Sequence, residues 1–188
     1  MPPVADPAAR RSLRARLRAG PIARAIAKVD LRLYRLLREY GHDPAVEMPI
    51  RRFSRLGEHA ALWLTLGLAG ALVDRSRRRQ WLRATRSVLA AYALNTLLKT
   101  VVRRKRPQLE KLPALIATPT SLSFPSAHAS SSFAAARAYG LLLPGAPLYP
   151  AATAMAISRV YLGVHYTSDI AAGALLGALV GSRGRLKA

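Results

Sequence analysis

Apolar residues recur along this chain in five segments of helical length, separated by polar turns. The segments are "HAALWLTLGLAGALV" ending at Val73, Ala84 to Val102, Ala129 to Leu143, Leu148 to Leu162, and "IAAGALLGALVG" ending at Gly181. None is an uninterrupted apolar run of about 20 residues, and runs of about 10 to 14 are more often helices of a soluble core. The interrupting charges include Lys99, Arg137 and Arg159. Because a charge inside a membrane tends to face a polar site, these segments are also compatible with membrane spans.

Three glycines lie four residues apart in the last segment, at Gly173, Gly177 and Gly181. This spacing places them on one stripe of a helix, where a neighbouring backbone can approach closely. Together with the short turns, the stripe favours an all-α fold, an integral membrane helical bundle of about five to six helices. The turn "DRSRRRQWLR" is basic and offers Trp81 as an anchor at the membrane interface.

The N-terminal region has a different composition. Residues 1–20 carry repeated arginines without the apolar run of a cleaved signal peptide, which indicates a basic flexible arm. From Pro21 to Tyr40, apolar residues at helical spacing alternate with Lys and Arg, which predicts a basic amphipathic helix. Such a helix either packs on a soluble core or lies in a membrane interface. We expect an interfacial helix and its connection over residues 21–56, followed by a membrane domain over residues 57–188.

The charge balance narrows the class of partner. The chain has 30 Lys+Arg against 9 Asp+Glu, a formal net charge of +21, which favours nucleic acid, anionic lipid headgroups or phosphorylated substrates. Nucleic acid gives no reason for five apolar helices, and aromatic residues for base stacking are only 6% of the chain. The absence of cysteine excludes thiolate metal sites and disulfides. Lipid headgroups and a phosphorylated substrate are therefore the expected partners.

Two polar clusters flank the long Pro-containing connection from Arg103 to His128. Lys99 and Arg106 stand seven residues apart in "KTVVRRKRP", so they share one face if the helix persists to the following proline. On its own this is more often a basic patch that contacts lipid phosphates. In "SFPSAHASSSF", Ser126 can cap the next helix, whose N–H groups favour an anion. His128 alone is more often a structural residue.

The third polar cluster is "SRVYLGVHYTSD", which contains Arg159, His165 and Asp169. A carboxylate four residues after an imidazole can accept its Nδ1–H and leave a lone pair on Nε2, although a helix-capping Asp beside an unrelated His is the ordinary alternative. Taken together, the three clusters supply cations for phosphate oxygens, a nucleophile and an acid. That combination is typical of phosphoryl transfer.

The three motifs resemble the signature of the type 2 phosphatidic acid phosphatase (PAP2) superfamily. "KTVVRRKRP", "PSAH" and "SRVYLGVHYTSD" are similar, in order and spacing, to Lys-x6-Arg-Pro, Pro-Ser-Gly-His and Ser-Arg-x5-His-x3-Asp. The resemblance implies a phosphatase that needs neither a metal nor another cofactor. The implied residues are the nucleophile His165, which would form a phosphohistidine, its partner Asp169, the acid His128, and the phosphate-binding residues Lys99, Arg106, Ser126, Ala127 and Arg159.

One residue departs from the family pattern, because Ala127 stands where the family usually has Gly. The methyl group requires a backbone conformation open to L residues and narrows the approach of the phosphate. Since alanine keeps its backbone N–H, we expect activity to survive with an altered substrate fit.

The resemblance also bears on the substrate. The superfamily includes soluble phosphatases and haloperoxidases, but the apolar helices and the glycine stripe favour its membrane branch, where small chains resemble bacterial polyprenyl-lipid phosphatases. We expect decaprenylphosphoryl-5-phosphoribose, a precursor of cell-wall arabinose donors, as the substrate. Undecaprenyl diphosphate and phosphatidic acid or phosphatidylglycerophosphate are the alternatives. An inactive membrane scaffold is the non-enzyme alternative, but it gives no reason for the spacing of the histidines and the aspartate.

The expected location is the bacterial cell membrane, with several spans. Five spans place His165 and the Arg103 to His128 connection on one face, and the turn "DRSRRRQWLR" and the tail "SRGRLKA" on the other. The positive-inside rule then puts the catalytic face outside the cytoplasm. The basic N-terminus argues against this orientation, which leaves the opposite one open.

Overall fold

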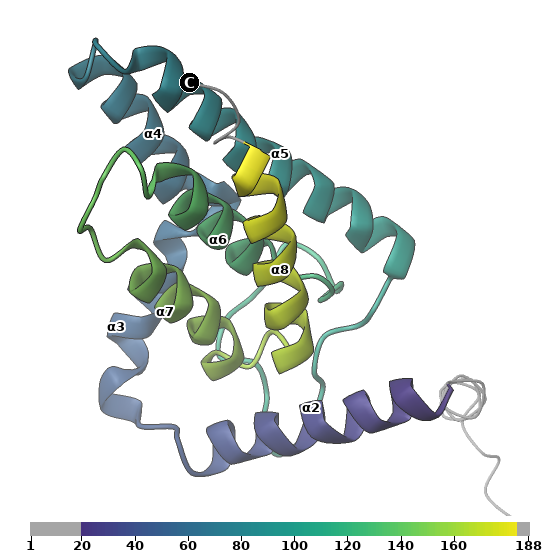
Figure 1. The fold of residues 1–188 in the computed structure, drawn as a ribbon. Coiled ribbons are helices and arrows are strands. Elements are labelled where there is room, and N and C mark those ends of the chain that lie inside the picture. The colour runs from purple at the N-terminus through teal and green to yellow at the C-terminus, as the bar shows by residue number, and fades with distance from the viewer. Residues whose placement is uncertain (1–19, 184–188) are drawn as a thin grey trace, which may run out of the picture.

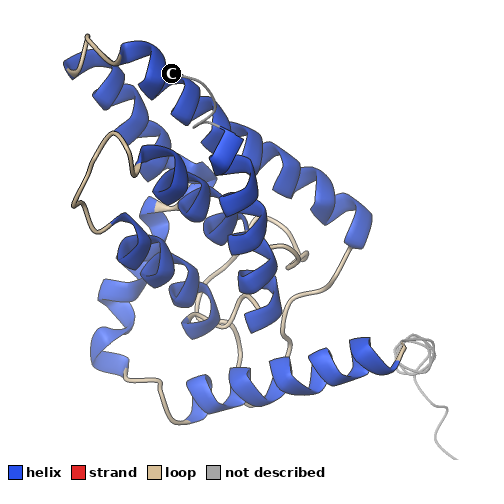
Figure 2. Cartoon of the chain, viewed as in Figure 1, coloured by secondary structure: helices blue, strands red, loops and turns tan. Residues whose placement is uncertain are grey.

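The computed structural model describes residues 20–183, which form helices and connecting loops with no strand in that range (Figure 2). Its elements are α2 (Pro21–Glu39), α3 (Pro44–Leu56), the 3-10 turn η1 (Glu58–Ala60), α4 (Ala61–Val73), α5 (Arg78–Val102), α6 (Ala127–Tyr139), α7 (Leu148–Tyr161) and α8 (Thr167–Arg183). The expected all-α bundle is therefore confirmed. Most of the predicted basic arm and the end of the C-terminal tail lie outside the described residues.

Helix α6 is the centre of the bundle, and it packs against α5, α7 and α8 (Figure 1). The glycine stripe of α8 faces α6. A Cβ atom at Gly173 would lie 2.6 Å from the carbonyl oxygen of Ser126, and one at Gly181 would lie 2.6 Å from that of Ala134. The stripe therefore lets the two backbones approach directly, as its spacing predicted.

Trp81 belongs to the apolar core and not to the membrane interface. Its ring is buried against Gly70 and lies 5.5 Å from the ring of Tyr139, and its indole N–H donates to Asp74 at 3.2 Å. The expected interface anchor is therefore wrong. The small residue Gly70 on α4 admits the ring between the two helices, which the composition of the turn alone does not reveal.

The connection expected after the N-terminal helix contains a second helix, α3. Asp43 caps it by accepting the N–H of Ala45 at 2.8 Å, and Pro44 occupies the first helical position. Helix α3 ends at Leu56, and the chain then passes through two left-handed residues, His59 and Ala60, into α4. Among residues 20–183, no helix by itself combines the length and apolar character of a bilayer span, whereas α3 and the segment Glu58–Val73 do so as a pair bent by 51°.

The connections that hold Arg106, Ser126 and His165 lie at one end of the bundle. Helix α2 lies across this end, together with the turn between α7 and α8 and the long connection after α5, while the α4–α5 turn and the end of α8 lie at the opposite end (Figure 1). Helix α5 ends at Val102, because Arg103 adopts a left-handed conformation (φ 53°). The helix therefore does not persist to Arg106, which belongs to the connection and reaches the site from there.

Candidate active site

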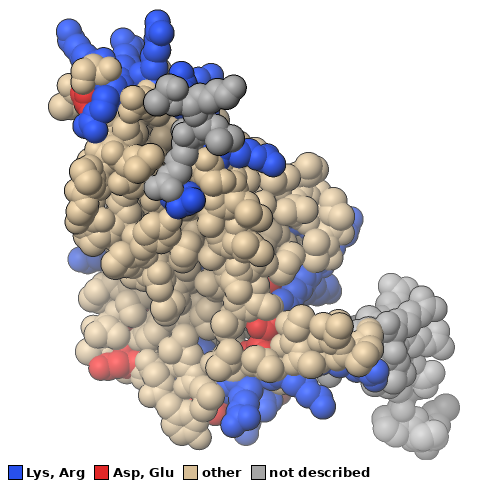
Figure 3. All heavy atoms as spheres, in the orientation of Figure 1, with Lys and Arg blue, Asp and Glu red and all other residues tan. Residues whose placement is uncertain are grey.

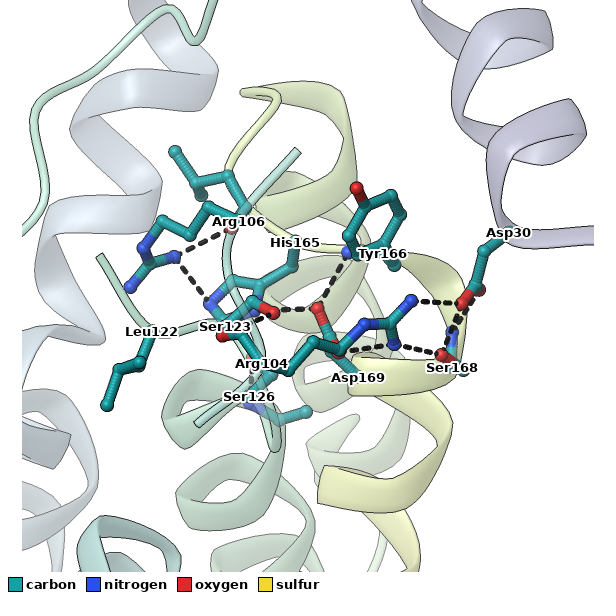
Figure 4. Close-up of polar contacts among 12 residues, drawn as sticks. Asp30, Arg104, Arg106, Leu122, Ser123, Ser126, His165, Tyr166, Ser168 and Asp169 are labelled. Atoms are coloured by element: carbon teal, nitrogen blue, oxygen red, sulfur yellow. Dashed lines mark hydrogen bonds and ion pairs between the residues drawn. The ribbon is translucent and has the colours of Figure 1, made fainter. Parts of the chain in front are cut away.

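His165 stands between a cation and a carboxylate in the turn between α7 and α8 (Figure 4). Nη1 of Arg106 lies 3.2 Å from its Nε2, and Oδ2 of Asp169 lies 3.5 Å from its Nδ1. A guanidinium only donates hydrogen bonds, so Nε2 must be the acceptor, and the ring proton of neutral His165 sits on Nδ1, facing Asp169. Among the described residues Nδ1 has no hydrogen-bond partner, so its approach to Asp169 is a close contact and not a formed hydrogen bond. Arg106 is held in turn by the carbonyl oxygens of Val164 at 2.7 Å and Thr120 at 2.8 Å.

The surroundings of His165 favour its neutral form. The residue is only 2% exposed, and burial lowers its pKa well below the usual range. The positive charges of Arg106, Lys99 and Arg159 lower this pKa further. An unprotonated Nε2 is what a nucleophile requires, although its lone pair here accepts from Arg106 and must be released before it can attack.

Ser54, near the end of α3, contacts two of the predicted site residues, Arg159 and His128. Its hydroxyl oxygen accepts from Nη1 of Arg159 at 2.6 Å, and its backbone carbonyl accepts from Nε2 of His128 at 3.0 Å. All three residues are buried. The Nε of Arg159 has no hydrogen-bond partner among the described residues, so a buried cationic donor remains available in this cluster. Such a donor suits an anionic ligand.

The remaining predicted residues lie around the start of α6. Ser126 caps this helix by accepting the N–H of Ala129 at 3.4 Å, and its own N–H donates to the carbonyl of Asp169 at 3.0 Å. Ala127 is the first residue of α6, and its φ is not in the left-handed region. The methyl group therefore does not strain the backbone. Lys99 donates from Nζ to the carbonyl of Ser123 at 3.2 Å.

The structure brings all eight predicted residues to one end of the bundle, and it adds others that the sequence analysis did not identify. Ser54 contacts two of the predicted residues from a helix distant in sequence. Arg104 donates to Asp169 at 2.9 Å and to Asp30 of α2 at 2.7 Å. In the sequence, the only indication that Arg104 belongs to the site is its place in the basic run "RRKRP". Nothing in the sequence points to Ser54. Among the described residues, no group of three or more His, Cys, Asp or Glu side chains is arranged to hold a metal ion.

Comparisons with known proteins identify the family of this chain. The PAP2 superfamily profile matches residues 80–183, which include all three motifs. Decaprenylphosphoryl-5-phosphoribose phosphatase of Mycobacterium tuberculosis is 46% identical over 143 residues, covering 74% of this chain and 78% of that protein. The profile match and this relative together support the assignment of the chain as a phosphoric monoester hydrolase.

Two solved structures share the fold. LpxE of Aquifex aeolicus superposes with a TM-score of 0.69 at 24% identity, covering 85% of this chain and 96% of the other. The transmembrane PAP2-type phosphatidylglycerolphosphate phosphatase of Bacillus subtilis superposes with a TM-score of 0.69 at 23% identity, covering 86% and 85%. The chain therefore shares its fold with these two proteins. By sequence profile and relatives, the chain belongs to the PAP2 superfamily.

Proposed function

We propose that this protein removes the terminal phosphate of a polyprenyl-linked phosphosugar, decaprenylphosphoryl-5-phosphoribose, without a metal ion. The proposed reaction is supported by the arrangement of three side chains, in which His165 lies between Arg106 and Asp169. The unprotonated Nε2 of His165 is next to a cation that can bind phosphate. The observation that carries the substrate is the 46% identity to the mycobacterial enzyme of that name. The product lipid would feed the synthesis of cell-wall arabinose donors.

The reaction would proceed in two steps. In the first, Nε2 of His165 attacks phosphorus, a nitrogen–phosphorus bond forms, the bond from phosphorus to the ester oxygen breaks, and His128 protonates the departing oxygen. Asp169 stabilises the positive charge that develops on the imidazole. In the second, water attacks the phosphohistidine and gives a proton back to His128, the nitrogen–phosphorus bond breaks with its electron pair returning to Nε2 of His165, and inorganic phosphate leaves. The cationic side chains of Lys99, Arg106 and Arg159, with Ser126 and the N–H groups at Ala127, would hold the phosphate oxygens.

Two hollows, one of them bounded by Arg106, suit a substrate with a polar head and a lipid tail. A cavity of about 590 Å³ has a mixed lining, with Arg106 and polar residues such as Gln108 and Thr120 beside apolar residues such as Leu109 and Pro113. A groove of about 450 Å³ runs between α2, α7 and α8 and is lined mainly by Leu33, Leu36, Ile157 and Ile170. The first would take the pentose and the second the beginning of the prenyl chain.

The proposed setting is a cell membrane crossed several times, with the site on the extracytoplasmic side. In the view of Figure 3, Lys and Arg gather at the two ends of the molecule, and the surface between them is mostly uncharged. The α4–α5 turn would be the cytoplasmic end, as the positive-inside rule favours. On α2, Ile22 is 75% exposed and Val29 is 56% exposed, so an apolar face is open to the interface, with cations beside it for anionic headgroups.

The test is phosphate release by the detergent-purified protein from decaprenylphosphoryl-5-phosphoribose, undecaprenyl diphosphate and phosphatidic acid. We expect the phosphosugar lipid to be preferred, the His165→Ala variant to be inactive although folded, and EDTA to leave the rate unchanged while vanadate inhibits. A preference for undecaprenyl diphosphate would contradict the substrate. Inhibition by EDTA that added metal reverses would contradict the mechanism, and no release from any lipid by the folded protein would favour a scaffold.

A further inference from the structure

Helix α2 presents a polar face to the rest of the protein. Its three buried residues are Asp30, Tyr34 and Arg38, which lie four residues apart on one side of the helix. Tyr34 donates to the carbonyl of Leu112 or of Gly163, and Arg38 donates to the carbonyls of Tyr161 at 3.2 Å and Pro113 at 2.8 Å. Tyr34 and Arg38 therefore attach the helix to loop backbone, whereas Asp30 makes a different kind of contact.

Asp30 is connected to the proposed catalytic carboxylate through two residues (Figure 4). Its Oδ2 accepts from Nη2 of Arg104 at 2.7 Å and from the hydroxyl of Ser168 at 2.5 Å, and its Oδ1 accepts the N–H of Ser168 at 2.8 Å. Nη1 of Arg104 donates to Oδ1 of Asp169 at 2.9 Å and to the hydroxyl oxygen of Ser168 at 2.6 Å. The guanidinium also stacks over the ring of Tyr166, 4.2 Å from its centroid.

This arrangement leaves one oxygen of Asp169 for His165. Arg104 occupies Oδ1, while Oδ2 accepts the N–H of Tyr166 at 2.8 Å and faces Nδ1 of His165. A planar guanidinium between two carboxylates fixes the orientation of both, because its N–H directions are rigid. Without the carboxylate of Asp30, Nη2 of Arg104 would lose its charged partner, and the guanidinium would be held less firmly, by Asp169, Ser168 and the ring of Tyr166.

We propose that Asp30 and Arg104 are positioning residues, which hold the carboxylate of Asp169 in the orientation that His165 needs. Helix α2 is thereby part of the active site, although its other face is open to the membrane interface. The inference rests on the proposed role of His165 as the nucleophile. Neither Asp30 nor Arg104 needs to contact the substrate, so their loss should lower kcat with little change in KM.

The kinetic test is a double-mutant cycle in detergent-purified protein. We expect Asp30→Asn to lower kcat about tenfold or more, and to cause no further loss in an Asp169→Asn background, because its effect passes through that carboxylate. Arg38→Gln is the matched control, since it loosens the same face of α2 without a contact to Asp169, and its effect should be additive with Asp169→Asn. Arg104→Lys keeps the charge and loses the fork, so it should behave like Asp30→Asn.

A second measurement does not depend on turnover. The chain has four histidines, so the tautomer of His165 can be followed by imidazole nitrogen NMR, with His165→Gln to assign the signal. We expect the proton on Nδ1 in the wild type and in Arg38→Gln, and a mixture of tautomers in Asp30→Asn. If Asp30→Asn keeps both the tautomer and a rate equal to that of Arg38→Gln, the inference is wrong even when phosphate is released. If the wild type releases no phosphate but the tautomer changes as expected, the proposed function fails and the positioning role stands.

Discussion

Nη1 of Arg106 lies 3.2 Å from Nε2 of His165, so a cation rests on the nitrogen that is proposed to attack phosphorus. The contact requires this nitrogen to be unprotonated, and under the proposed function it lies where a phosphate oxygen would bind. When a phosphate enters, its oxygens can take over the guanidinium donors and leave the lone pair of Nε2 free. The resting site is therefore close to the arrangement that the reaction requires.

The first prediction concerns pH. Burial and the three nearby cations lower the pKa of His165 below the ordinary value of about 6.5, and only the neutral ring can attack. The value of kcat/KM should therefore fall as the pH drops through this lowered pKa, and more than about half of the plateau should remain at pH 6.5. The measurement is a pH profile, with the substrate phosphate titrated separately because its own second pKa is about 6. A midpoint above 6.5 would contradict the prediction.

A second prediction concerns Ser54. Replacing it with alanine removes the acceptor of Arg159 but leaves the backbone carbonyl that holds His128. A buried donor without its partner costs about 1 to 3 kcal/mol, and a less ordered Arg159 should raise KM by about tenfold. Steady-state kinetics of Ser54→Ala would test this, with Ser182→Ala near the far end of α8 as the control. Equal KM values for the two variants would remove Ser54 from the site.

The third prediction uses the glycine that separates α3 from α4. A Cβ atom at Gly57 would lie 2.7 Å from Cδ2 of His128 and 2.6 Å from Sδ of Met155. Gly57→Ala should therefore displace the imidazole and lower kcat, by about tenfold or more if His128 is the acid. Gly20→Ala is the control, because a Cβ there meets nothing within 4 Å. An unchanged kcat in both variants would show that His128 tolerates the shift or has no catalytic role.

The fourth prediction concerns the packing of α8 on α6. A Cβ atom at Gly177 would collide with the backbone carbonyl of Ser130, which cannot move aside as a flexible side chain can. Gly177→Ala should lower the free energy of unfolding by about 1 to 3 kcal/mol. Thermal unfolding in detergent measures the change, and Leu179→Ala, at a position 60% exposed, is the comparison. If the glycine variant unfolds at the wild-type temperature, the close approach of the two helices is not needed for stability.

Several features of the fold follow from local spacing along the chain and could be predicted from it. Apolar periodicity located the helices α4 to α8, because each buries a repeating face, and the interval of four between Gly173, Gly177 and Gly181 identified a face for close packing. The three motifs identified the predicted site residues, because the spacing inside each motif is short. His165 and Asp169, for example, are only four residues apart, so local chain geometry brings them together. Local spacing also indicated a helix from Pro21, but not which of its faces is buried.

The residues that complete the candidate site from distant parts of the chain could not be predicted in this way. Asp30 and Arg104 are 74 residues apart and Ser54 and Arg159 are 105 apart, and no periodicity links such pairs. The burial of Trp81 depends on a glycine in the preceding helix, and the position of Arg106 depends on the left-handed residue that ends α5. Contacts of this kind form only when helices pack at particular distances and angles. Their energies depend on which side chains the fold brings together, and a local sequence pattern does not contain that information.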